Sequence, residues 1–75
     1  MKIYQVIESL RIERGITKTR IAKEFDKSSA WYTDVSKGRI SIKAEDIKVF
    51  SKFFQVEPSF FFDHEVNESF KKEVG

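Results

Sequence analysis

The polar side chains best placed to do chemistry lie near the middle of the chain, on a short stretch that we expect to be helical. Ser29, Ala30, Thr33 and Asp34 would share the side of that helix that faces away from the core. Hydroxyl and carboxylate groups can bond to base edges, and a methyl group can contact the methyl of thymine. A short helix with such side chains and basic residues on both flanks suits insertion into the major groove of DNA. An ordinary helical hairpin with a solvated polar face accounts for these residues equally well.

Other kinds of chemistry find little support in the sequence. The chain has no cysteine and one histidine, His64, which has no patterned second ligand, so a metal site is not expected. The carboxylates Asp34, Glu45 and Asp46 are most simply solvated acids on helix surfaces. The chain has neither a nucleophile–base pair nor a glycine-rich phosphate loop. We therefore expect no enzymatic activity and no cofactor.

The charge of the chain is distributed unevenly. Residues 11–52 carry eleven Lys and Arg against six Asp and Glu, a local charge of +5, whereas residues 53–75 carry two Lys against five acids, a local charge of −3. A basic surplus around an exposed short helix is typical of a nucleic-acid-binding surface. No apolar run approaches the roughly 20 residues of a membrane span, and the first residues carry no signal-peptide core. We therefore expect a cytoplasmic protein with no membrane partner.

Two short helices joined by a tight turn are expected to position the polar face. Thr17 and Ser28 are N-cap candidates, because a side-chain oxygen there accepts from a backbone N–H that the helix leaves unpaired. Gly38 would end the second helix, where a left-handed residue is commonly needed. Apolar residues at helical spacing would pack the two helices on the core. These residues are Ile21, Ala22, Phe25, Tyr32 and Val35.

Helices are also expected before and after this pair. An apolar stripe predicts a helix over residues 3–14, ended by Gly15. The stripe consists of Ile3, Val6, Ile7 and Leu10. A second stripe predicts a helix from residue 43 or 44 to residue 54. Its inward-facing residues would be Ala44, Ile47, Phe50 and Phe54. Pro58 suits the first position of a fifth helix, in which Phe61 is the candidate for burial.

This pattern of five short helices, with the second and third as a tight pair, resembles the lambda-repressor/Cro-type helix-turn-helix family, also called Xre-like. The resemblance runs without gaps from about residue 3 to residue 62. The matching stretches are residues 10–17 (LRIERGIT), 21–25 (IAKEF), 28–38 (SSAWYTDVSKG) and 47–56. The resemblance implies an all-α, compact five-helix DNA-binding domain over residues 1–62. Residues 63–75 would then be a helical or partly disordered tail that could extend a dimer interface.

Three positions depart from the family pattern. Asp26 stands where the turn usually has glycine, and Asp tolerates the left-handed region better than most residues. Lys27 stands where the family usually buries Val, so its aliphatic stem would have to cover the core. Family members often pair an arginine of the first helix with a glutamate that ends the third. Here Arg11 is present but Ser36 holds the partner position, so Arg11 would either bind phosphate or find another acid.

The resemblance also implies which residues would contact DNA. Base edges would be read by Ser29, Ala30, Thr33 and Asp34, with Trp31 at the margin of the same face. Phosphates would be contacted by Lys18, Lys23, Lys27, Ser28, Lys37, Arg39 and Lys43. None of the base-reading residues makes a bidentate Arg-to-guanine or Gln-to-adenine pair, so direct readout would be modest and DNA shape would contribute.

Two residues on this face allow more than one interpretation. Asp34 is either a base contact or a carboxylate that is solvated or paired within the chain. Trp31 has three interpretations. It could wedge against sugar or thymine methyl groups, anchor a protein partner, or lie partly buried against Lys27 and the neighbouring turn.

We therefore expect a transcriptional regulator, most simply a repressor of the phage or mobile-element kind. It would bind double-stranded DNA at a partly palindromic operator as a homodimer. Phe62, Val66 and Phe70 fall four residues apart and are the candidates for the dimer interface. The alternative is a helix-turn-helix domain repurposed to bind a regulatory protein, as an antirepressor, antitoxin or polymerase-binding module.

Overall fold

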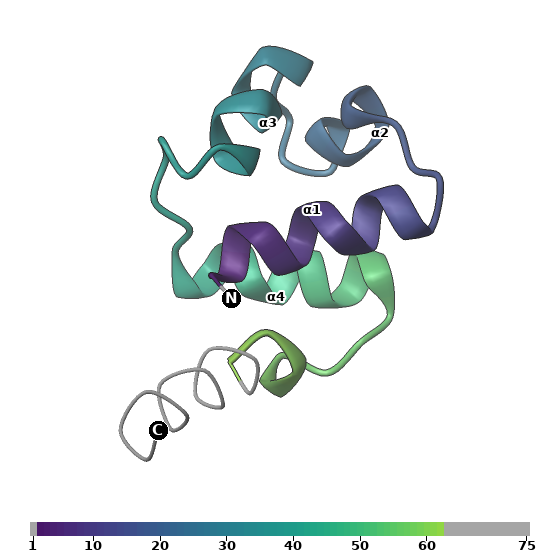
Figure 1. The fold of residues 1–75 in the computed structure, drawn as a ribbon, viewed down its shortest axis with the longest axis vertical. Helices are drawn as coiled ribbons and strands as arrows, with labels where there is room; N and C mark the ends of the chain where they lie inside the picture. The colour runs from purple at the N-terminus through teal and green to yellow at the C-terminus, as the bar shows by residue number, and fades with distance from the viewer. Residues whose placement is uncertain (1, 63–75) are drawn as a thin grey trace, which may run out of the picture.

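Short helices account for most of the described chain. The computed structural model describes residues 2–62. Its helices are α1 (Ile3–Glu13), α2 (Lys18–Lys23), α3 (Ser29–Ser36) and α4 (Ala44–Phe54), and residues 59–62 form a further helical turn (Figure 1). No residue between 2 and 62 belongs to a strand. The expected all-α, compact five-helix architecture is thus confirmed for this part of the chain. None of its helices is long and apolar enough to cross a membrane.

The two helices of the central pair begin at the caps expected from the sequence. Thr17 Oγ1 accepts a hydrogen bond of 3.1 Å from the backbone N–H of Arg20. Ser28 Oγ accepts one of 3.4 Å from the N–H of Trp31. Both caps satisfy a donor that the first turn of a helix cannot pair internally. Their positions fix where α2 and α3 start.

The four labelled helices are each followed by a residue in the left-handed backbone region. The φ angles are +66° at Gly15, +56° at Asp26, +75° at Gly38 and +59° at Gln55. The next N–H along the chain then bonds back to a carbonyl five residues earlier, as in a Schellman motif. The bonded pairs are Ile16–Arg11, Lys27–Ala22, Arg39–Asp34 and Val56–Ser51, at 3.0–3.1 Å. Asp26 therefore adopts the turn conformation for which the family more often uses glycine.

Gly38 is required by space as well as by its backbone angle. A Cβ atom added there would lie 2.8 Å from two ring carbons of Tyr4. The aromatic ring of α1 therefore packs directly on the backbone that leaves α3.

The core joins all of these helices. In Figure 1 the α2–α3 pair lies on one side of α1, and residues 59–62 lie on the other. Ring contacts tie the end of α2 to α4, since the Phe25 and Phe50 centroids are 4.6 Å apart. The buried apolar residues are Val6, Ile7, Leu10, Ile21, Ala22, Tyr32, Val35, Ile47, Phe50, Phe54 and Phe61.

The expected core is confirmed except at Ala44, with Ile3 and Phe25 only partly buried against it. Phe61 is fully buried, as its place among three consecutive phenylalanines suggested. Ala44 was expected to face inward but is exposed. It is the first residue of α4, and the helix starts one turn before Ile47, the first of its residues to be buried. The prediction was wrong because helical spacing does not show where the packed part of a helix begins.

Candidate nucleic-acid interface

A polar network on the inner side of α3 holds this helix against α1. The hydroxyl of Tyr32 donates to Glu8 Oε1 at 2.9 Å. Arg11 forms a bidentate pair with the same carboxylate, through Nε at 2.7 Å and Nη2 at 2.9 Å. Arg11 Nη1 also donates to the Ile16 carbonyl at 2.6 Å. We call Glu8, Arg11 and Tyr32 the inner network. It fixes α3 on α1 with charge-assisted hydrogen bonds.

The inner network shifts the protonation of its members. The hydrogen bonds from Arg11 hold the pKa of the Glu8 carboxyl below its usual value of 4.5, although partial burial acts in the opposite direction. The bond to Glu8 raises the pKa of the Arg11 guanidinium. Burial, aided by the bond to Glu8, raises the pKa of the Tyr32 hydroxyl. All three groups are therefore held in their usual charge states at neutral pH.

Arg11 thus takes the second of the two roles expected for it, because it pairs with an acid. That acid is Glu8, three residues earlier on the same helix, and not a residue of α3. Glu8 and its bond to Tyr32 were missed by the sequence analysis. The spacing of Glu8 and Arg11 is a recognisable helical pair. The link to Tyr32 depends on how α1 and α3 pack, which no local pattern shows.

The opposite side of α3 carries the candidate base-reading residues. Ser29 and Ala30 are exposed, and Thr33 and Asp34 are partly exposed. Thr33 Oγ1 donates to the Ser29 carbonyl at 3.1 Å and lies 3.4 Å from Lys18 Nζ, which donates to it. The structure therefore brings together Lys18, the first residue of α2, and Thr33, in the middle of α3.

Asp34 is paired within the chain. Arg39 Nη1 lies 3.3 Å from Asp34 Oδ1, and the Arg39 and Asp34 side chains are 65% and 44% exposed. The pair forms because Gly38 reverses the chain after α3, and the backbone N–H of Arg39 bonds to the Asp34 carbonyl at 3.0 Å. Of the interpretations left open for Asp34, the structure therefore contains the paired carboxylate. We call Asp34–Arg39 and Lys18–Thr33 the outer pairs.

Trp31 lies partly buried beside the α2–α3 turn. Its ring centroid is 5.0 Å from that of Phe25, and the planes are tilted by 42°. It also lines a surface hollow of about 330 Å³, together with Lys27 and Lys43. This is the packing against Lys27 and the turn that the sequence analysis included among its three interpretations.

The remaining basic candidates surround α3. Lys23, Lys27, Lys37 and Lys43 are exposed, and Lys18 is partly exposed. Lys23 ends α2, Lys27 lies in the turn, and Lys37 and Lys43 flank the connector after α3. Within residues 2–62 the ion pairs of the structure involve none of these lysines. The ammonium groups of the four exposed lysines are therefore available to an anionic partner, whereas that of Lys18 donates to Thr33.

The candidate dimer residues are described only in part. Phe62 is 44% exposed and is one of two large apolar side chains in residues 2–62 with such exposure, the other being Ile12 at 62%. Val66 and Phe70 lie outside the described residues, as does His64. In the part of the chain that the structure describes, no three His, Cys, Asp or Glu residues gather as metal ligands would.

Comparison with known proteins does not show which family the chain belongs to. No protein-family model matches the chain, and no curated protein matches it. Any function must therefore be argued from the arrangement of the residues themselves.

Proposed function

We propose that this protein is a sequence-specific DNA-binding transcriptional regulator, and that α3 enters the major groove. The observation that carries the proposal is the division of α3 into two sides. Tyr32 and Val35 are buried and the inner network anchors Tyr32, whereas Ser29 and Ala30 are exposed and Thr33 and Asp34 are partly exposed. A rigidly held short helix with small polar side chains facing outward matches what a major groove admits.

The charges around α3 support the same proposal. Exposed lysines before and after the helix would lie along the two phosphate strands that border a groove. Ser28 caps the start of α3, and the exposed Lys37 and Arg39 follow its end, so groups that could contact the DNA backbone would lie at both ends of α3. One such domain offers few phosphate contacts, so a homodimer on a partly palindromic operator would be needed for useful affinity.

The direct test is selection of bound sequences from random duplex DNA, followed by a salt titration on a duplex with one half-site of the winner. We expect an enriched inverted repeat and affinity that falls steeply as salt rises. Arg39→Ala should weaken binding to all duplexes and lower the salt slope by about 0.9. Thr33→Ala should weaken binding to the selected half-site more than to random DNA.

Lys48→Ala is the matched control for lost charge, since Lys48 lies on α4 outside the candidate interface. A single half-site removes any effect of dimerisation from this comparison. If no sequence is enriched, and Arg39→Ala and Lys48→Ala weaken residual binding equally, the proposal fails.

A second candidate function is binding of a regulatory protein through the same face. The observation in its favour is the acid Asp34, which phosphates repel, beside the partly exposed indole of Trp31. Indole side chains are common anchors in protein interfaces. If the DNA selection enriches no sequence and a Trp31→Ala variant folds normally, then the indole is not needed for the fold. That combination would favour binding of a regulatory protein over binding of DNA.

A further inference from the structure

Lys18, the first residue of α2, holds its ammonium group against the middle of α3. Its Nζ atom lies 3.4 Å from Thr33 Oγ1, and Thr33 is the fifth of the eight residues of α3. The helices α2 and α3 lie side by side, so the lysine stem reaches from one to the other (Figure 1). The family resemblance implies a phosphate contact for Lys18, but this position suits a different role.

The chemistry of the atoms fixes the direction of two hydrogen bonds at Thr33. A carbonyl oxygen can only accept, and an ammonium group can only donate. The Thr33 hydroxyl therefore gives its proton to the Ser29 carbonyl at 3.1 Å and accepts from Lys18. Because a hydroxyl has one proton, Thr33 can offer DNA only its remaining lone pair.

The ammonium group of Lys18 keeps donors for a partner. In the described part of the chain, Thr33 is its one hydrogen-bond partner, and the group takes part in no ion pair. An ammonium group has three donors, so two remain. The contact to Thr33 is long, and the ammonium group can therefore shift toward a partner at small cost.

The place of the ammonium group along α3 favours a base contact over a phosphate contact. Thr33 lies on the side of α3 that carries the candidate base-reading residues, between Ser29 and Asp34. With α3 in the major groove, that side would face base edges, whereas the phosphate strands would border the groove. An ammonium group in contact with Thr33 would therefore meet bases, and it would have to leave Thr33 to reach the groove border.

Guanine is the base whose major-groove edge fits two spare donors. It presents two neighbouring acceptors, N7 and O6, without a donor. Adenine presents one acceptor beside an amine, cytosine presents an amine, and thymine presents one acceptor beside a methyl group. A cation with two free N–H groups at this place therefore selects guanine.

We propose that Lys18 reads a guanine in the major groove, and that Thr33 is the residue that positions its ammonium group. The inference rests on the proposed DNA-binding function and deepens it, because it assigns one base of the operator half-site. It also adds a direct contact to a set of base-reading residues on α3 that contains neither arginine nor glutamine.

Base substitution in the selected half-site provides the test. Each position of a single half-site is changed in turn to the three other bases, and binding is measured by fluorescence anisotropy at one salt concentration. The unmodified chain should prefer guanine at one position by at least about fivefold. Lys18→Met keeps the length of the side chain and removes its donors. This variant should bind all four bases at that position to within about twofold and keep the other preferences.

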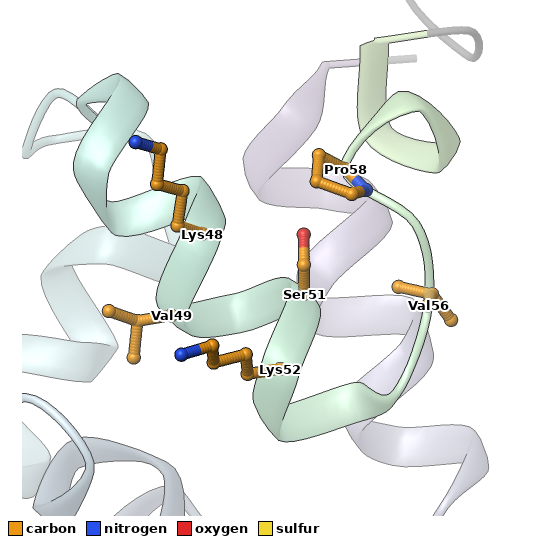
Figure 2. A pocket seen from close by; sticks show the side chains of 6 residues that line it. All are labelled: Lys48, Val49, Ser51, Lys52, Val56 and Pro58. Carbon is orange, nitrogen blue, oxygen red and sulfur yellow. The ribbon is translucent and has the colours of Figure 1, made fainter.

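Two lysines elsewhere control for the lost charge. Lys23 ends α2 and is exposed, and Lys48 lines an open hollow of about 360 Å³ beside α4 (Figure 2). A phosphate contact strengthens binding to every sequence alike, so Lys23→Met should weaken binding to all duplexes and leave the base preferences unchanged. Lys48→Met should leave the base preferences unchanged as well.

Two variants of Thr33 test its positioning role. Thr33→Val keeps the shape of the side chain without the hydroxyl, and Thr33→Ser keeps the hydroxyl. Thr33→Val should reduce the guanine preference of the unmodified chain, whereas Thr33→Ser should retain it. In the Lys18→Met background, Thr33→Val should have no further effect at that position. An equal effect in both backgrounds would overturn the positioning role.

Two outcomes would overturn the role of Lys18, provided that circular dichroism shows a folded variant. One is that Lys18→Met weakens binding equally whichever base is present, as loss of a phosphate contact would. The other is that the position it relaxes prefers a base other than guanine. Both outcomes leave the proposed DNA-binding function standing, since enrichment of a sequence supports it independently. If no sequence is enriched, both proposals fail.

Discussion

The two sides of α3 carry polar contacts of very different strength. On the inner side, Arg11 and Glu8 make a bidentate pair at 2.7 and 2.9 Å, with side chains only 14% and 24% exposed. On the outer side, Asp34 and Arg39 make one contact at 3.3 Å, with side chains 44% and 65% exposed. A helix eight residues long is thus held from one side and left adjustable on the other.

This difference shows how a small domain can fix a helix on one side and keep its other side accessible to a partner. Partly buried, charge-assisted hydrogen bonds stabilise a fold because their partners have little access to water as a substitute. Exposed single contacts contribute little, since water and salt compete with them. The outer pairs can therefore break at small cost when a nucleic acid offers phosphates and base edges, while the inner network keeps α3 in place.

The largest expected effect comes from breaking the inner network. Glu8→Ala removes the acceptor of both Arg11 and Tyr32 and leaves two polar groups without their partner. We expect a loss of about 1–3 kcal/mol in the free energy of unfolding, measured by urea denaturation. Asp34→Ala is the control from the outer side, and should change that free energy by no more than about 0.5 kcal/mol. Equal losses in the two variants would show that the two sides do not differ as the geometry indicates.

Acid should weaken the same network. Because the pKa of Glu8 is lowered in the folded chain, this carboxylate stabilises the fold above its unfolded pKa of about 4.5, and the contribution is lost as the pH falls through the lower folded value. The free energy of unfolding should therefore fall below pH 4.5 more steeply in the unmodified chain than in Glu8→Gln. If the free energy of unfolding falls with pH equally steeply in the unmodified chain and in Glu8→Gln, then another group causes the acid sensitivity.

Features set by neighbours along the chain could be predicted from the sequence. The caps at Thr17 and Ser28 and the left-handed residues at Gly15 and Gly38 depend on contacts within a few residues, and all four are confirmed. The burial of Phe61 was also expected, because three successive phenylalanines on a helix, residues 60–62, cannot all face one core.

Features set by packing could not be predicted in the same way. The Tyr32–Glu8 bond joins residues 24 apart and exists only because α3 lies across α1. Arg39 reaches Asp34 because the chain reverses at Gly38, which the sequence marked as a helix end without showing what the reversal would bring together. Ala44 matched the apolar stripe of α4, yet no core lies opposite the first turn. The residues proposed to read DNA are exposed as expected, and their role stays a prediction.

The smallest expected effect concerns the outer side, where Asp34 restrains Arg39. Asp34→Ala removes a negative charge from the proposed DNA-binding face and releases the guanidinium from its 3.3 Å contact. An exposed pair of this kind is worth at most about 1 kcal/mol, which corresponds to about a fivefold change in affinity. We expect binding to random duplex DNA at low salt to strengthen by up to that factor, measured by fluorescence anisotropy. Binding to the selected half-site should gain less, because any cytosine amine that Asp34 accepts from would lose its partner.

The double variant Asp34→Ala with Arg39→Ala should lose the gain on random DNA. If Asp34→Ala alone weakens binding to all duplexes, then the carboxylate holds the Arg39 side chain in its binding position, and the outer pair is as much a part of the site as the inner network is of the fold.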